Sequence, residues 1–232
     1  MKLTENQIEQ LYKFTRQHYV YHYDVQTELV DHLANDIEEF WKENPKLTFE
    51  QARDKSFKKF GIFGFMDVVE AKEHQLGKRY RSILWMFMKK WFTIPKIIIT
   101  AFIFCFFYSL MSLHIKSDYL AILMLLLAII DIVIAQRLKK ESERRFSKKG
   151  KKFLLEDIIF RVGAFSTIIV FSNFFHLSPF FENTTSVLGK VLVSGLITIA
   201  IIYSYVSLVV IPQKAEELLQ ETYPEYKIVN NL

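Results

Sequence analysis

The chain has 232 residues, of which 51% are apolar and 22 are Phe, with only 7 Gly and 5 Pro. This composition predicts helices and leaves little material for Gly-rich loops that cradle phosphate. Charge divides the sequence, because residues 1–77 carry 10 Lys/Arg and 14 Asp/Glu, whereas residues 78–232 carry 20 and 11. We therefore expect two regions that face two different solvents. The single cysteine, Cys105, lies in an apolar run, which excludes a disulfide framework and a cysteine-based metal site.

The acidic region reads as three or four short helices. Thr4 and Gln7 have capping-box spacing, so a first helix is predicted to begin at Thr4. Apolar residues recur every four positions over 24–43 and predict a second helix, which Asn44 and Pro45 end. Thr48 is expected to cap a third helix over 49–60, and residues 63–76 make a fourth. No apolar segment precedes these helices, so no cleavable signal peptide is expected.

The basic region begins with residues 78–91, a basic stretch with two Trp that is typical of a helix lying on a membrane surface. Four apolar runs follow, each near the ~20 residues that span a bilayer. They are Pro95–Leu113, Tyr119–Gln136, Phe153–Leu177 and Val187–Ile211.

The connections between these runs differ in charge. Residues 137–152 hold nine Lys/Arg against two Glu, and basic residues also precede the first run. The positive-inside rule then places this loop, the lead-in and the tail from Gln213 in the cytoplasm. All three fit only an even number of crossings, so four helices with both termini inside are predicted.

The predicted fold is all-α: a small cytoplasmic helical bundle followed by about four transmembrane helices. The boundaries are 1–77 for the cytoplasmic domain, 78–94 for the interfacial helix, 95–212 for the transmembrane domain and 213–232 for a cytoplasmic tail.

One stretch carries recognisable motifs. Glu28 to Leu33 reads E-L-V-D-H-L, Glu50 to Arg53 reads E-Q-A-R, and Phe60-Gly61 follows. Over about Tyr23–Gly61 the sequence resembles the small helical domain that prefixes some bacterial permeases and the HAAS-type domain found with PadR-family regulators. Two features depart from that pattern, the Asn-Pro-Lys-Leu-Thr turn after the second helix and the Phe-rich segment after Gly61. The resemblance implies a regulatory or interaction module attached to a membrane unit, and no catalytic residues.

Four side chains of that stretch form a candidate site: Glu28, Asp31, His32 and Asp36. Their i, i+3 and i+4 spacing brings carboxylates and an imidazole together, as a metal site would. The alternative is that His32 packs at the edge of the bundle while the acids face water, as part of a partner-binding surface. We expect no metal, because the sequence contains no second set of ligands.

Two charges fall inside predicted spans, Asp131 in the second and Arg161 in the third. Charge inside a bilayer is costly, so such residues pair or serve a transport path. We predict an ion pair between Asp131 and Arg161, with a proton or substrate path as the alternative.

The sequence lacks the common phosphate-binding, dinucleotide, hydrolase and zinc-protease motifs, so we expect neither an enzyme nor a cofactor. Topology and anionic lipid explain the basic loop without nucleic acid. The expected function is that of a bacterial inner-membrane protein whose cytoplasmic domain binds or senses a soluble partner, with a PadR-like regulator the partner that the resemblance implies. The alternative is an accessory subunit of a membrane transporter.

Overall fold

The computed structural model describes residues 2–113, 117–162 and 186–226, and every regular element in these ranges is a helix. The all-α prediction is therefore confirmed for this part of the chain. The chain divides into two compact units, described separately below. The first contains residues 1–78 and 149–155, and the second contains residues 79–148 and 156–232.

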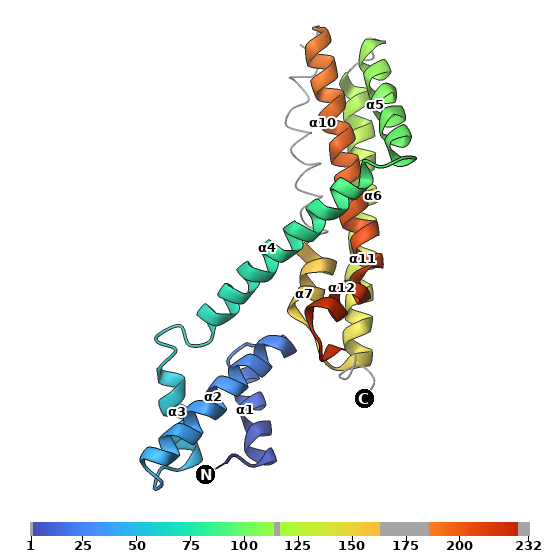
Figure 1. The fold of residues 1–232 in the computed structure, drawn as a ribbon. Helices are drawn as coiled ribbons and strands as arrows, with labels where there is room; N and C mark the ends of the chain where they lie inside the picture. Colours follow the sequence, from blue (N-terminus) through green and yellow to red (C-terminus); the bar gives the residue numbers. More distant parts are fainter. Residues whose placement is uncertain (1, 114–116, 163–185, 227–232) are drawn as a thin grey trace. The chain divides into compact units, whose positions relative to one another are not determined.

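The first unit is built on α1 (Glu5–Gln17), α2 (Tyr23–Glu43) and α3 (Phe49–Lys58), shown in blue in Figure 1. Thr4 forms the capping box with Gln7 that the sequence predicts, and Thr48, predicted to cap its helix, forms a second one with Gln51. Asn44 ends α2 as expected. Local hydrogen bonding thus sets the first three helices.

The core of this unit consists of apolar side chains on one face of each helix. Leu11 of α1 and Val25, Leu29, Leu33 and Ile37 of α2 are fully buried. An aromatic cluster adjoins them, in which Phe14, His18, Phe57, Phe60 and Phe65 meet mostly edge to face.

Helix α4 (Met66–Trp91) replaces the two helices predicted over 63–76 and 78–91. The only helix breaker in this range is Gly77, and one Gly costs a helix only about 1 kcal/mol relative to Ala. The change in composition at residue 78 therefore does not interrupt the helix. Helix α5 (Lys96–Ser112) follows at an angle of 88° to α4, after a break that contains Pro95.

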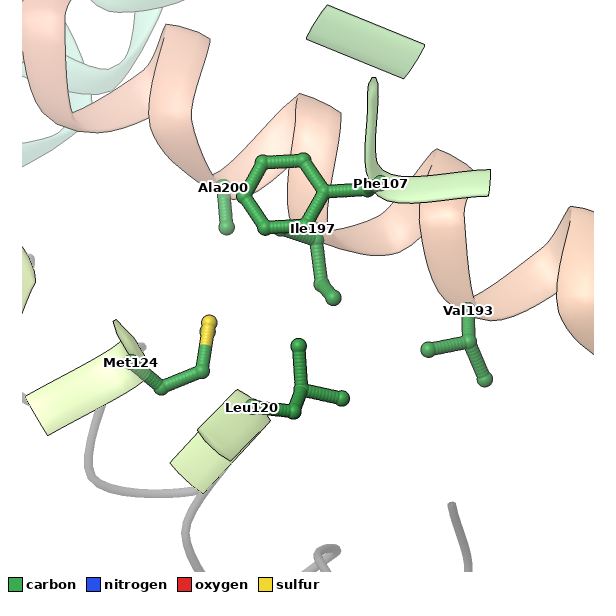
Figure 2. Packing of buried hydrophobic residues seen from close by; sticks show 6 residues of the cluster. All are labelled: Phe107, Leu120, Met124, Val193, Ile197 and Ala200. Carbon is green, nitrogen blue, oxygen red and sulfur yellow. The ribbon is translucent and has the colours of Figure 1, made fainter. Parts of the chain in front are cut away.

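The second unit contains α5, α6 (Ser117–Lys149) and α10 (Val187–Tyr205), which run side by side in Figure 1. Figure 2 shows the apolar cluster that holds them together. Phe107 of α5, Leu120 and Met124 of α6 and Val193 and Ile197 of α10 point towards one another and are buried. The consecutive helices α5 and α6 therefore share one apolar seam with α10, which is far from them in the sequence.

Two helical stretches are long and apolar enough to cross a membrane, 119–147 and 187–213, and a third is added if the bent pair of α4 and α5 counts as one span. A membrane protein is thus supported, with two or three spans among the described residues. Most of the run predicted at Phe153–Leu177 lies outside the described residues, which here include α7 (Leu154–Asp157) and a π-helical turn (Ile158–Val162).

The tail contains a short helix, α12 (Ala215–Thr222). It follows a second π-helical turn (Val206–Val210) and α11 (Ile211–Gln213). Leu218, Leu219 and Tyr226 are buried in the second unit, so this segment is packed. The π-helical turn before it carries Ser207, whose hydroxyl lies 2.9 Å from the hydroxyl of Tyr80.

Candidate functional site

The first unit contains a segment that the sequence places far from it. Residues 149–155 connect α6 to the next apolar stretch, yet they pack on the first turn of α2. The backbone N–H of Tyr23 donates to the carbonyl of Lys152 at 2.7 Å. The carboxylate of Asp24 accepts from the backbone N–H of Leu154 at 3.0 Å. We call Tyr23, Asp24 and residues 151–155 the α2 clamp.

Side chains complete the α2 clamp. The ring of Phe153 meets the ring of Tyr23 edge to face, with 5.7 Å between centroids, and the ammonium of Lys151 lies 4.4 Å from the centre of the Tyr23 ring. Phe153, Leu154 and Leu155 are almost completely buried. Three buried apolar residues, one backbone–backbone hydrogen bond and one hydrogen bond to a side chain make this segment part of the first unit, although it is remote from it in the sequence.

The first turn of α2 suits this role electrostatically. The unpaired N–H groups of a helix N-terminus carry partial positive charge, which favours the carboxylate of Asp24. The side-chain amide of Gln26 also donates to the carbonyl of Val20 at 2.6 Å and fixes the chain that enters the helix. Asp24 is thereby held in place to accept the Leu154 N–H.

The predicted partner surface on α2 splits into two pairs. Glu28 is bound to Lys72 at 2.6 Å, and Asp36 accepts from the Ser56 hydroxyl at 2.7 Å and from Lys59 at 2.9 Å. Asp31 and His32 are exposed. Within the described ranges, no group of three or more His, Cys, Asp or Glu side chains could hold a metal ion.

The two predicted intramembrane charges have other partners in the structure. Both carboxylate oxygens of Asp131 lie 2.7 Å from the hydroxyl of Ser204 on α10, and both residues are buried. Arg161 forms an ion pair of 3.2 Å with Asp157, one turn earlier, and its side chain is more than half exposed. The pairing of Asp131 with Arg161 stays a prediction.

A further charged contact joins the end of α6 to the tail. The guanidinium of Arg145 bonds Glu141 of its own helix and Glu216 of α12, each at 3.2 Å, and lies 5.1 Å from the centre of the Phe160 ring. The Arg145 side chain therefore contacts three parts of the second unit: α6, α12 and the π-helical turn that contains Phe160. The sequence offers no sign of this contact beyond the presence of opposite charges.

The α2 clamp is the feature that sequence reasoning misses. Phe153 and its neighbours read as the beginning of an apolar span, and Asp24 reads as an ordinary acid in a first helical turn. The one available signal is that Gly150 interrupts the basic run before Phe153; in the structure Gly150 has a φ of +66° and ends α6. No family model, curated protein sequence or solved structure matches the chain.

Proposed function

We propose that this chain is a non-enzymatic integral membrane protein of the bacterial inner membrane. Its N-terminal helical unit binds a soluble protein partner. Its membrane helices anchor this unit and transmit its conformational state. The apolar helices of the second unit support the membrane location. The resemblance around Glu28 to Leu33 supports the interaction role and favours a regulator of the PadR type as the partner.

The observation that carries this proposal is the α2 clamp. Residues 149–155 continue directly from α6 on one side and into residues 156–162 on the other. A partner that shifts α2 would pull on Lys152 and Leu154 through their hydrogen bonds to Tyr23 and Asp24. The same chain segment therefore belongs to the sensing unit and to the ends of two helical stretches of the second unit.

Two contacts support the proposed topology, with both termini on the cytoplasmic side. The α2 clamp requires the N-terminal unit and the loop after α6 to lie on one side of the membrane. The ion pair between Arg145 and Glu216 requires the end of α6 and the tail to share a side as well. These constraints agree with the positive-inside rule, because the loop at residues 137–152 is strongly basic.

The exposed side chains of α2 provide the surface for a partner. Lys72 and Lys59 neutralise Glu28 and Asp36, whereas Asp31 and His32 face solvent from neighbouring positions. A basic patch on the partner would complement Asp31, and the imidazole of His32 adds a hydrogen-bonding group beside it.

A second candidate function is that of an accessory subunit of a membrane transporter. It is favoured by α6, because only 17% of its most apolar stretch is buried, against 56% for the span at 187–213. Exposed apolar side chains such as Leu125, Leu126 and Ile130 can face lipid or a second membrane protein. The two functions differ in which surface the partner contacts.

Affinity purification from native membranes in mild detergent separates them. The double variant Asp31→Lys/His32→Glu should lose a partner that binds α2, while Glu9→Lys, an exposed acid on α1, should retain it. Retention of the partner by both variants, together with its loss when α6 residues are changed, would refute the α2 surface and favour the transporter role.

Topology is tested by labelling with a membrane-impermeant thiol reagent on a Cys105→Ala background. Position 118 should react in intact cells when it is changed to Cys, and position 144 should react only after lysis. Reaction of position 144 in intact cells would overturn the cytoplasmic assignment.

A further inference from the structure

The turn between α3 and α4 presents large apolar side chains to solvent. Ile62 is 99% exposed, Phe63 is 71% exposed and Met66 is half exposed. Loop tips of water-soluble domains are usually formed by Gly, Pro, Asn, Asp and Ser, which meet the backbone requirements without apolar surface. We call Ile62 and Phe63 the apolar tip.

The residues on both sides of the apolar tip are fixed in position by backbone conformation and by packing. Gly61 and Gly64 both adopt a positive φ, at +74° and +57°. Phe65, directly after Gly64, is almost completely buried, with its ring 4.8 Å from the Phe57 ring and 4.9 Å from the Phe60 ring. A Cβ at Gly64 would lie 2.9 Å from the Phe57 ring, so the turn is packed tightly on the aromatic cluster. The exposure of Ile62 and Phe63 is thus set by the fold.

A bilayer surface is the occupant that the connectivity favours. The unit that carries the apolar tip also contains residues 149–155, which continue directly from α6, one of the helices apolar enough to cross a membrane. The same unit passes through α4 into the second unit. Both connections tether the unit to the apolar helices, and such tethering raises the effective concentration of lipid above that of an untethered soluble partner.

Charge next to the apolar tip fits the same occupant. Lys55 and Lys58 are exposed on the last turn of α3, shortly before the tip, and Lys59, which follows them, is bound to Asp36. Anionic lipid attracts lysines at the cytoplasmic surface. Asp67 and Glu70, in the first turns of α4, are better solvated in water than in lipid. Only the tip itself would therefore enter the membrane.

We propose that Ile62 and Phe63 insert into the boundary between headgroups and acyl chains of the cytoplasmic leaflet, with Lys58 contacting anionic headgroups. The inference rests on the membrane location put forward under the proposed function. It adds a second, reversible membrane contact to the anchoring by the spans. The N-terminal unit would therefore be oriented by lipid as well as by the α2 clamp.

The test uses the full-length chain with Cys105→Ala, reconstituted into vesicles of zwitterionic lipid with or without anionic phosphatidylglycerol. An environment-sensitive dye is attached to Ile62→Cys or Phe63→Cys, and spin-labelled lipids serve as quenchers. Glu39→Cys, exposed on α2 of the same unit, is the water-facing control, and Leu126→Cys, exposed on α6, reports membrane insertion. The dye at 62 and 63 should shift to the blue and be quenched in anionic vesicles, whereas the dye at 39 should do neither.

Each other outcome counts against the proposal. A dye at 62 and 63 that behaves like the one at 39, while the dye at 126 is quenched, overturns the apolar tip alone and leaves the membrane location intact. A blue-shifted dye that spin-labelled lipid does not quench shows that protein covers the tip, and this also overturns it. An unquenched dye at 126 refutes the membrane location and the tip together. Lys58→Glu should weaken quenching at 62 in anionic vesicles. Unchanged quenching would refute the proposed contact between Lys58 and anionic headgroups.

Discussion

The carboxylate of Asp24 accepts a hydrogen bond from the backbone N–H of Leu154, 130 positions later in the chain, at 3.0 Å. Both residues are buried, so water is poorly placed to substitute for either group. A hydrogen bond to a charged acceptor contributes more than a neutral one, about 1.5–3 kcal/mol. This bond therefore joins the beginning of α2 to a segment that continues from a candidate membrane span.

Asp24→Ala is expected to lower the free energy of unfolding by about 1.5–3 kcal/mol, because it leaves the Leu154 N–H buried without an acceptor. Asp24→Asn keeps an acceptor oxygen and should cost less. Thermal unfolding in detergent measures the loss, and hydrogen exchange should show faster exchange at the Leu154 amide. Glu39→Ala, an exposed acid of the same helix, is the control and should change stability by less than about 0.5 kcal/mol. Equal losses for the Ala variants at 24 and 39 would contradict the role of the α2 clamp.

A fragment of residues 1–78 should fold into helices but melt at a lower temperature than the same unit in the full chain, because it lacks the buried side chains of residues 153–155. Adding a peptide of residues 149–157 should raise the melting temperature of the fragment in proportion to peptide occupancy. The Asp24→Ala fragment should respond much less, and a peptide with Phe153 and Leu154 changed to Ser serves as the second control. A fragment that is indifferent to the native peptide would argue against the clamp.

Gly64→Ala is expected to destabilise the first unit. Its φ of +57° costs an L-residue roughly 1–2 kcal/mol, and the added Cβ meets the Phe57 ring at 2.9 Å. Gly77→Ala is the matched control, since a Cβ there meets nothing within 4 Å and the residue lies inside α4. That change should stabilise the protein, by up to about 1 kcal/mol. Chemical unfolding measures the change in the free energy of unfolding for both variants. A change of the same sign at both positions would contradict the strained, tightly packed conformation of Gly64.

Ser204→Ala should lower the stability of the second unit in detergent by about 1–3 kcal/mol, because the Asp131 carboxylate loses a buried donor. A double-mutant cycle with Asp131→Asn should give a coupling energy above 0.5 kcal/mol, in the range for residues in contact. Ser112→Ala, whose hydroxyl donates to the Tyr108 carbonyl of the same helix, is the control.

A parallel cycle pairs Asp131→Asn with Arg161→Gln. From the structure we expect weaker coupling than for Asp131 with Ser204, because Arg161 is bound to Asp157. Recovery of stability in the double variant would instead establish the pair that the sequence predicts.

The sequence predicts the local parts of this fold well. Thr4 and Thr48 begin their helices because a hydroxyl and a Gln three residues later satisfy backbone N–H groups within one turn, and this signal needs no tertiary context. The apolar period of α2 likewise predicts the buried face that contains Leu33 and Ile37.

Long-range features were not predictable in the same way. The change in charge at residue 78 coincides with the boundary of the first unit, but it leaves the helix unbroken, because a single Gly77 is too weak a helix breaker. The α2 clamp joins the Asp24 carboxylate to a backbone N–H group 130 positions later, and every sequence possesses such backbone donors. The sequence alone indicates that the charge of Asp131 would be costly inside a bilayer. Its hydrogen bond to Ser204 was not predictable, because it depends on the packing of α6 against α10.

The discontinuity of the first unit also sets an order for biosynthesis. A ribosome delivers residues 1–78 before residues 149–155, and this second segment of the unit follows only after α5 and α6 have been made. Until then Tyr23 and Asp24 have no Lys152 or Leu154 to bind. The N-terminal unit therefore reaches its final form only after α5 and α6 have been synthesised. A fully folded N-terminal unit is thus a sign that both of these apolar helices have been made.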